Sequence, residues 1–196
     1  MTYKVIDSNE YIDTYNFSSL ITKADTQEIM QISKSIIDSG LYFENSPKYQ
    51  TKENLFGRDE KVFLKMRQSF IYSCFMYLGK EVKIKGINSW VFMTKKSDEP
   101  DRDNLWHKHH YDEPWGKLSG IFYLHIPDDI VDRELCGTEF SETSENVRAQ
   151  LPTKTFFVRP KDLTWHIYPS KMWHRSGITN SDEYRFVYAA DMDYYE

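Results

Sequence analysis

The chain lacks the features that would assign it to several protein classes at once. It has only two cysteines, Cys74 and Cys136, which match no C-x-x-C pattern and are too few for a disulfide framework. No uninterrupted apolar run approaches the ~20 residues that a membrane helix needs. The acidic N-terminus has no apolar stretch typical of a signal peptide. We therefore expect a protein of the reducing cytoplasm with no membrane partner.

An excess of positive charge is also missing. The 196 residues include 25 Lys and Arg against 30 Asp and Glu, which gives a formal net charge of −5. This balance supplies no global electrostatic reason to bind nucleic acid, and we expect no such partner. Aromatic residues, in contrast, make up 16% of the chain, and their side chains pack well on β-sheets. The length suits a single domain, which we expect to span residues 1–196.

Two helices are predicted in the first 80 residues. Apolar residues recur at helical spacing over residues 25–39 and again over residues 58–78. Gly40 and Gly79 follow the two segments directly, where a glycine commonly ends a helix. Residues 1–80 are therefore expected to form a mainly helical support.

Short β-like runs follow Gly79. They cover residues 82–94, 104–112, 118–126, 136–140, 154–160, 163–169, 172–177 and 184–192. About eight short strands without helical patterns between them indicate an antiparallel sandwich or jelly roll rather than a parallel α/β sheet. The fold class expected is mainly β with N-terminal helices, and residues 81–196 form its jelly-roll core.

All six histidines lie in this β-rich part, and three of them stand in the stretch HKHHYDEPW at residues 107–115. Because side chains alternate along a strand, His110 and Asp112 would point to the same face. Two histidines and one carboxylate can hold non-haem Fe(II) with adjacent coordination positions open. Such a site needs a further histidine, for which His125, His166 and His174 are the candidates.

The residue that favours His174 is an arginine. Arg185 follows His174 by eleven residues, on the next predicted strand. From there its guanidinium could form a bidentate pair with the far carboxylate of a dicarboxylic cosubstrate. His125 lies between apolar neighbours and is expected to be structural, while His166 is expected to be a wall or outer-shell residue.

Together these motifs resemble the 2-oxoglutarate- and Fe(II)-dependent oxygenases, and within them the prolyl-hydroxylase-like branch. The matching segments lie within residues 82–192 and are His110-x-Asp112, IFYL (121–124), CGTEF (136–140), YPSKMWH (168–174) and Arg185. The resemblance implies a double-stranded β-helix, the jelly roll of this family. It also implies that His110, Asp112 and His174 bind Fe(II), while Arg185 and Tyr123 hold the C5 carboxylate of 2-oxoglutarate as cosubstrate.

The reaction implied by the resemblance is that of a hydroxylating dioxygenase. It would consume O2 and 2-oxoglutarate, hydroxylate a C–H bond and release succinate and CO2. The substrate is unidentified, either a small molecule or a protein side chain such as a peptidyl residue. One departure concerns Val187, because many members carry a Ser or Thr two residues after the arginine. Arg185 and Tyr123 would therefore need another helper.

Tryptophans accompany the candidate ligands. Most are expected to pack in the core or at its rim, but Trp106, Trp115 and Trp173 are candidates for the wall of an apolar substrate pocket.

Two alternatives stay open. His107 and His109 also stand at i and i+2, and with a later histidine they would form the His-only site of a cupin-like metalloenzyme. Such an enzyme would not use 2-oxoglutarate, and Arg185 would lie away from its metal. A slip of one residue in strand register would reverse the choice between the two pairs. A non-enzymatic β-sandwich binding module, which would carry no metal, is the other alternative.

Overall fold

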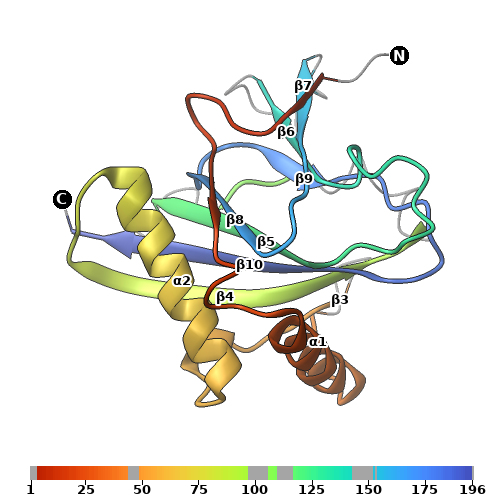
Figure 1. Ribbon diagram of the computed structural model, residues 1–196, viewed down its shortest axis with the longest axis horizontal. Coiled ribbons are helices and arrows are strands. Elements are labelled where there is room, and N and C mark those ends of the chain that lie inside the picture. Colours follow the sequence, from red (N-terminus) through yellow and green to blue (C-terminus); the bar gives the residue numbers. More distant parts are fainter. Residues whose placement is uncertain are drawn as a thin grey trace.

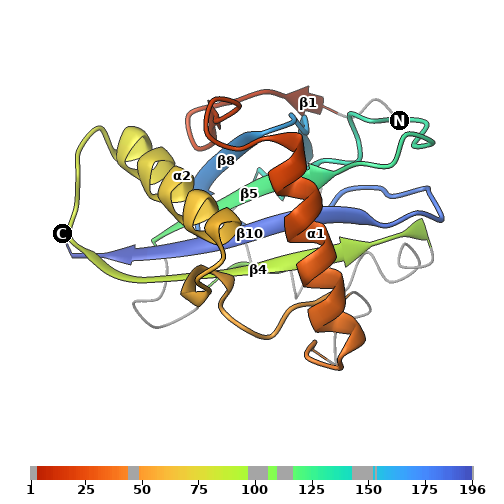
Figure 2. The same ribbon diagram turned by 60° about the horizontal axis from the view of Figure 1, so that its bottom comes forward.

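The chain folds into two facing β-sheets with helices on one outer side. The computed structural model describes residues 4–43, 49–96, 106–109, 117–142, 152 and 154–195. Within these residues the strands form a six-stranded and a four-stranded sheet. Figures 1 and 2 show helices α1 and α2 side by side on the face of the larger sheet that points away from the smaller one.

The helices begin and end where local chemistry favours it. Helix α1 (Lys23–Asp38) starts at a capping box, in which Thr22 and Asp25 bond to each other's backbone N–H groups. Helix α2 (Lys61–Leu78) ends at Gly79, whose φ of +67° is readily adopted by glycine. Both predicted helices are confirmed. None of the helices in the described part of the chain is long and apolar enough to cross a membrane.

The larger sheet has the order β2-β8-β5-β10-β4-β3 and is antiparallel throughout. Its strands are β2 (Asp13–Asn16), β8 (Thr164–Pro169), β5 (Leu118–His125), β10 (Arg185–Tyr194), β4 (Ile84–Thr94) and β3 (Tyr49–Gln50). A short 3-10 helix, η1 (Leu55–Gly57), precedes α2. The long β10 strand lies between β5 and β4, so it forms the centre of this sheet.

The smaller sheet has the order β1-β7-β6-β9. Its strands are β1 (Lys4–Ile6), β7 (Thr155–Val158), β6 (Thr138–Ser141) and β9 (His174–Ser176), and only the β1–β7 pair among them is parallel. Seven of the predicted β-runs coincide with the strands β4 to β10 in order, although β6 extends one residue and β10 two residues beyond its predicted run. The eighth, residues 104–112, lies mostly outside the described residues.

Alternation along β10 separates a helix-side core from a cavity between the sheets. The even positions pack under the helices: Tyr188, Ala190 and Met192. The odd positions line the cavity: Arg185, Val187, Ala189 and Asp191. Strand period alone therefore places a charged residue at each end of one cavity-facing row.

His166 on β8 is buried between the sheets without a polar partner. It is 1% exposed, and neither of its ring nitrogens has a hydrogen-bond partner within the described residues. Its ring lies 5.4 Å from the ring of Tyr123. Burial, assisted by the charge of Lys161 and opposed by Asp7, lowers the pKa of His166 from 6.5 to about 3. The imidazole is thus neutral in the folded protein.

We expect His166 to make the fold sensitive to acid. Between pH 6.5 and about 3, the unfolded chain binds a proton at this residue that the folded chain does not bind. The free energy of unfolding should therefore fall by about 1.4 kcal/mol per pH unit in that window from this group alone. In His166→Leu, urea unfolding at pH 6.5 and 4.5 should show a smaller loss of stability than in the wild type. An equal loss in both proteins would contradict the prediction.

Candidate functional site

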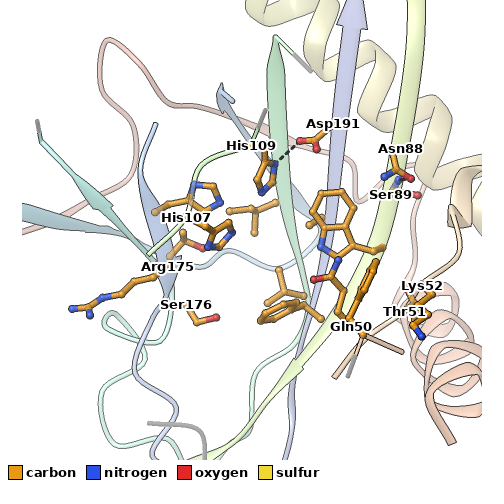
Figure 3. Close-up of a pocket in the computed structure, with 18 of the residues that line it drawn as sticks. Gln50, Thr51, Lys52, Asn88, Ser89, His107, His109, Arg175, Ser176 and Asp191 are labelled. Atoms are coloured by element: carbon orange, nitrogen blue, oxygen red, sulfur yellow. Dashed lines mark hydrogen bonds and ion pairs between the residues drawn. The ribbon is translucent and has the colours of Figure 1, made fainter. Parts of the chain in front are cut away.

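A cavity of about 360 Å³ opens between the two sheets, lined by residues of β3, β4, β5, β6, β8, β9 and β10. Figure 3 shows His107, His109 and Asp191 on one side of it, and Gln50, Thr51 and Lys52 on the other. The polar and charged side chains of the cavity come from strands of both sheets, so the cavity forms only when the two sheets pack face to face. The same cavity holds a cluster of histidines and a buried arginine.

The histidine cluster consists of His107, His109 and His174. Each offers a ring nitrogen, and these atoms all lie within 4.8 Å of one another. The ring centroids are 4.3 Å apart for His107 and His174, and 5.0 Å apart for His109 and His174. Three imidazoles at such distances form a set that could hold a metal ion.

The backbone fixes the register of this cluster. His107 and His174 form an isolated antiparallel bridge, with N–H to C=O distances of 3.0 and 2.8 Å in the two directions. The N–H of His109 donates to the carbonyl of Ser170 at 3.0 Å. The pair His107 and His109 is therefore positioned on the cavity side by its contacts with the β8–β9 connection and β9.

Hydrogen bonds at Nδ1 determine the tautomers of two of the rings. Nδ1 of His174 lies 2.9 Å from the carbonyl oxygen of Met172, and Nδ1 of His109 lies 2.7 Å from Oδ1 of Asp191. Since a carbonyl and a carboxylate only accept, both Nδ1 atoms carry the proton. The lone pair is then on Nε2, the usual arrangement in histidines that ligate a metal.

The charge state of His174 also fits a metal ligand. Burial first, and then the neighbouring His107 and His109, lower the pKa of His174 well below its ordinary value. A neutral imidazole is the form that binds a metal. Its Nε2 lies 3.3 Å from the hydroxyl of Tyr168, which also lines the cavity. A donor set of three imidazoles suits iron, among other transition metals.

Arg185 lies in the same cavity and is 2% exposed. Its Nη1 donates to the carbonyls of Cys136 and Gly137, and its Nε has no hydrogen-bond partner. Within the described residues no carboxylate pairs with it. Burial lowers the pKa of this guanidinium below its ordinary value, although arginine stays charged in proteins. A buried cation without an anion is costly, so the position is suited to an anionic ligand.

Tyr123 lies behind this arginine rather than on the cavity wall. Its ring is 5.9 Å from the guanidinium carbon of Arg185, and its hydroxyl is 3.0 Å from Oγ1 of Thr138. Burial raises the pKa of the Tyr123 phenol to about 12, so the hydroxyl stays protonated. Thr138 itself lines the cavity. A hydroxyl from β6 therefore stands next to the segment whose carbonyls hold Arg185.

The tryptophan on the cavity wall is not one of the three that the sequence suggested. Trp106 and Trp173 pack against each other as a small buried pair and do not line the cavity. The strand alternation explains this, because their neighbours His107 and His174 point inward. The guanidinium carbon of Arg175 lies 4.6 Å from the ring centroid of Trp106, and Nε of Arg175 lies 2.8 Å from Oε2 of Glu139. The indole on the cavity wall is that of Trp90, 5.3 Å from the ring of His109.

The remaining predicted site residues are placed as follows. His110, Asp112 and Trp115 lie outside the described residues. His125 pairs with Glu183 at 2.9 Å and does not line the cavity, in keeping with a structural role. The sequence interpretation did not find Thr138, Trp90 or Asp191. Asp191 stands in a run that reads as an ordinary strand, so only its odd position relative to Arg185 could have indicated a place in the cavity.

Comparison with protein families gives one match. The model of the 2OG-Fe(II) oxygenase family matches residues 88–191, just over half of the chain. This range begins and ends at cavity-lining residues of β4 and β10 and includes the whole histidine cluster. Comparison with curated proteins gives no significant sequence match.

Solved structures from several organisms share this fold. AviO1 from Streptomyces viridochromogenes Tue57 has a TM-score of 0.65 at 10% identity, covering 93% of this chain and 89% of that chain. A prolyl-4-hydroxylase from Pseudomonas putida has a TM-score of 0.61 at 6% identity, covering 95% of each. A Trichoplax adhaerens prolyl hydroxylase, solved with a hypoxia inducible factor peptide fragment, has a TM-score of 0.60 at 13% identity, covering 93% and 83%. The expected double-stranded β-helix is confirmed.

Proposed function

Because the chain belongs to the 2OG-Fe(II) oxygenase family, we propose that His107, His109 and His174 hold the Fe(II) with which it hydroxylates a C–H bond. The observation that carries this proposal is the meeting of two features in one cavity, the three-histidine cluster and a buried arginine with no carboxylate partner among the described residues. A metal-bound dicarboxylate would satisfy both of them.

The ligand set departs from the one implied by H-x-D. Both sets include His174, but His107 and His109 lie beside it, and each is held there by backbone hydrogen bonds. His110 and Asp112 stay a prediction, because they lie outside the described residues. The cupin-like alternative required Arg185 to lie away from the histidines, whereas here it lines the same cavity. This arrangement supports the use of 2-oxoglutarate with a three-histidine site.

The side chains of the cavity have separable tasks. Bound Fe(II) and 2-oxoglutarate supply the oxidising chemistry, in which O2 is consumed, 2-oxoglutarate becomes succinate and CO2, and a C–H bond gains a hydroxyl. Arg185 binds the C5 carboxylate through its guanidinium. Thr138, which lines the cavity, supplies a hydroxyl near that carboxylate, in place of the Ser or Thr that many family members carry where this chain has Val187. The hydroxyl of Tyr123 lies 3.0 Å from Oγ1 of Thr138 and holds it from behind. The buried position of Arg185 keeps bulk water away from this ion pair.

Aromatic side chains form one part of the cavity wall. Phe43, Trp90 and Phe92 line the cavity, together with polar groups such as Gln50 and Asn88. Apolar walls with a few polar groups are typical of sites that orient a small molecule or a single side chain. We propose an apolar C–H group as the target, carried by a small molecule or a protein side chain such as a peptidyl residue.

The cellular location that we propose is the cytoplasm. Cys74 and Cys136 are both buried free thiols, and they belong to different cores, one under the helices and one between the sheets. Free thiols of this kind are typical of proteins in reducing compartments.

The function is tested by adding Fe(II) and 2-oxoglutarate to the purified chain without oxygen. A weak visible charge-transfer band should appear that neither component gives alone. With air and cell extract, succinate should form, and mass spectrometry should reveal a product heavier by one oxygen. The absence of both the band and succinate would exclude the proposed function.

A further inference from the structure

We propose that Asp191 is a positioning residue for the iron site, which fixes the ring of His109 and supplies the negative charge that three neutral histidines lack. This inference rests on the proposed function, since it takes His109 as an iron ligand. In an H-x-D site a carboxylate ligand carries that charge directly. Here the carboxylate would act one imidazole further from the metal.

The contacts of Asp191 support this role. Its side chain projects from a cavity-facing position of β10, and the residue is 5% exposed. Oδ1 accepts from Nδ1 of His109 at 2.7 Å and from the hydroxyl of Ser119 at 2.6 Å. Figure 3 shows the His109–Asp191 bond at the edge of the cavity. Ser119 is the residue directly opposite Asp191 on β5, so sheet register brings the two together.

A second set of hydrogen bonds, through Ser119 and Ser170, holds the backbone of His109. Oγ of Ser119 lies 2.9 Å from Oγ of Ser170, and the carbonyl of Ser170 accepts from the N–H of His109. His109 lies outside the regular strands, yet its ring is anchored to the larger sheet and its backbone to Ser170, which directly follows β8. Such anchoring fixes a side chain that a loop alone would leave to rotate.

The chemistry of the bond explains why a carboxylate is present. A proton on Nδ1 that is shared with a carboxylate increases the electron density at Nε2, which strengthens binding to a cation. The bond also becomes stronger when a divalent ion sits on Nε2, because the ring then gains positive character. A neutral acceptor in place of Asp191 would keep the ring orientation but lose most of this coupling.

The chain offers a matched control on the same strand. Asp193 lies two residues further along β10, is 4% exposed, and pairs with Lys85 at 3.1 Å rather than with a histidine. Asp191→Asn and Asp193→Asn therefore remove the same charge from similarly buried positions of one strand. Only the first of them touches the proposed iron site.

The test measures Fe(II) affinity without oxygen, together with the charge-transfer band formed with 2-oxoglutarate. Asp191→Asn should weaken Fe(II) binding by about 10-fold and Asp191→Ala by up to about 100-fold, and the band should move to shorter wavelength as the iron loses electron density. Asp193→Asn should leave both unchanged. Ser119→Ala, which keeps the carboxylate, should give a smaller loss and serves if an Asp191 variant fails to fold. Wild-type affinity and band in Asp191→Asn would overturn the inference.

Failure of the proposed function gives a different result. In that case the wild-type chain itself shows neither Fe(II) binding nor a band. If the wild type binds iron and His109→Ala binds it equally well, His109 is not a ligand, and the role of Asp191 is overturned while the oxygenase activity stands.

Discussion

Replacement of His109 by alanine is expected to abolish iron-dependent turnover of 2-oxoglutarate, whereas replacement of Asp112 should leave most of it. The two variants separate the two possible ligand pairs, and His174→Ala, common to both sets, should be inactive. Loss of an outer partner of a metal ligand typically costs 10- to 100-fold. Loss of a ligand from a set of three should exceed ~100-fold, because the remaining two imidazoles hold the metal poorly.

The measurements are the bound iron per chain and the rate of succinate formation. His125→Ala is the control, because His125 pairs with Glu183 near the surface and does not line the cavity. It should retain wild-type iron content and rate. The opposite pattern, with Asp112→Ala depleted of iron and His109→Ala normal, would restore the H-x-D ligand set.

The sequence alone could not decide whether His107 and His109 or His110 and Asp112 face the cavity, and the reason is physical. Residues 107 and 109 share one face of an extended chain, and residues 110 and 112 share one face in the same way, so strand period treats both pairs alike. A backbone bridge to His174 places His107, and a backbone hydrogen bond to Ser170 places His109, both to partners far along the chain. Such long-range register leaves no local signal. The sequence does single out His174 and Arg185, which line the same cavity, because their spacing on consecutive strands is a local property.

The same distinction applies to the fold. Helices α1 and α2 were predictable, because apolar periodicity and a terminal glycine are local features. The strands β1 and β2 were not predicted, since they are only three and four residues long. They owe their extended form to pairing with β7 and β8, more than 140 residues away. Short edge strands of this kind are determined by tertiary contacts more than by propensity.

The next expected result concerns Arg185. Arg185→Ala should weaken the binding of 2-oxoglutarate by about 100-fold or more, because removing one partner of a buried charge pair typically costs 2–5 kcal/mol. The affinity for Fe(II) should change little, since the histidine rings keep their own hydrogen bonds. Arg185→Lys should be intermediate, because lysine keeps the charge but loses the planar fork that binds a carboxylate through two bonds.

A cosubstrate analogue isolates the carboxylate contact. 2-Oxopentanoate has the chelating oxo acid but no C5 carboxylate, so its weak binding should be nearly the same in the wild type and in Arg185→Ala. Isothermal titration with both acids, under nitrogen and with iron present, gives the comparison. An equal loss of affinity for both acids, or a parallel loss of iron, would show that Arg185 acts on the structure of the site instead.

The ligand-free protein provides a further check, because a buried cation without a carboxylate partner is destabilising. Under the proposed function, bound 2-oxoglutarate would supply the missing carboxylate, so the burial of Arg185 would raise affinity for the cosubstrate at the expense of stability. Arg185→Met should therefore unfold at the same or a higher temperature than the wild type when no ligand is present. With iron and 2-oxoglutarate the order should reverse, since only the wild type gains the full stabilisation from binding. A lower unfolding temperature of the ligand-free variant would mean that the bonds from Arg185 to the carbonyls of Cys136 and Gly137 outweigh the cost of its burial.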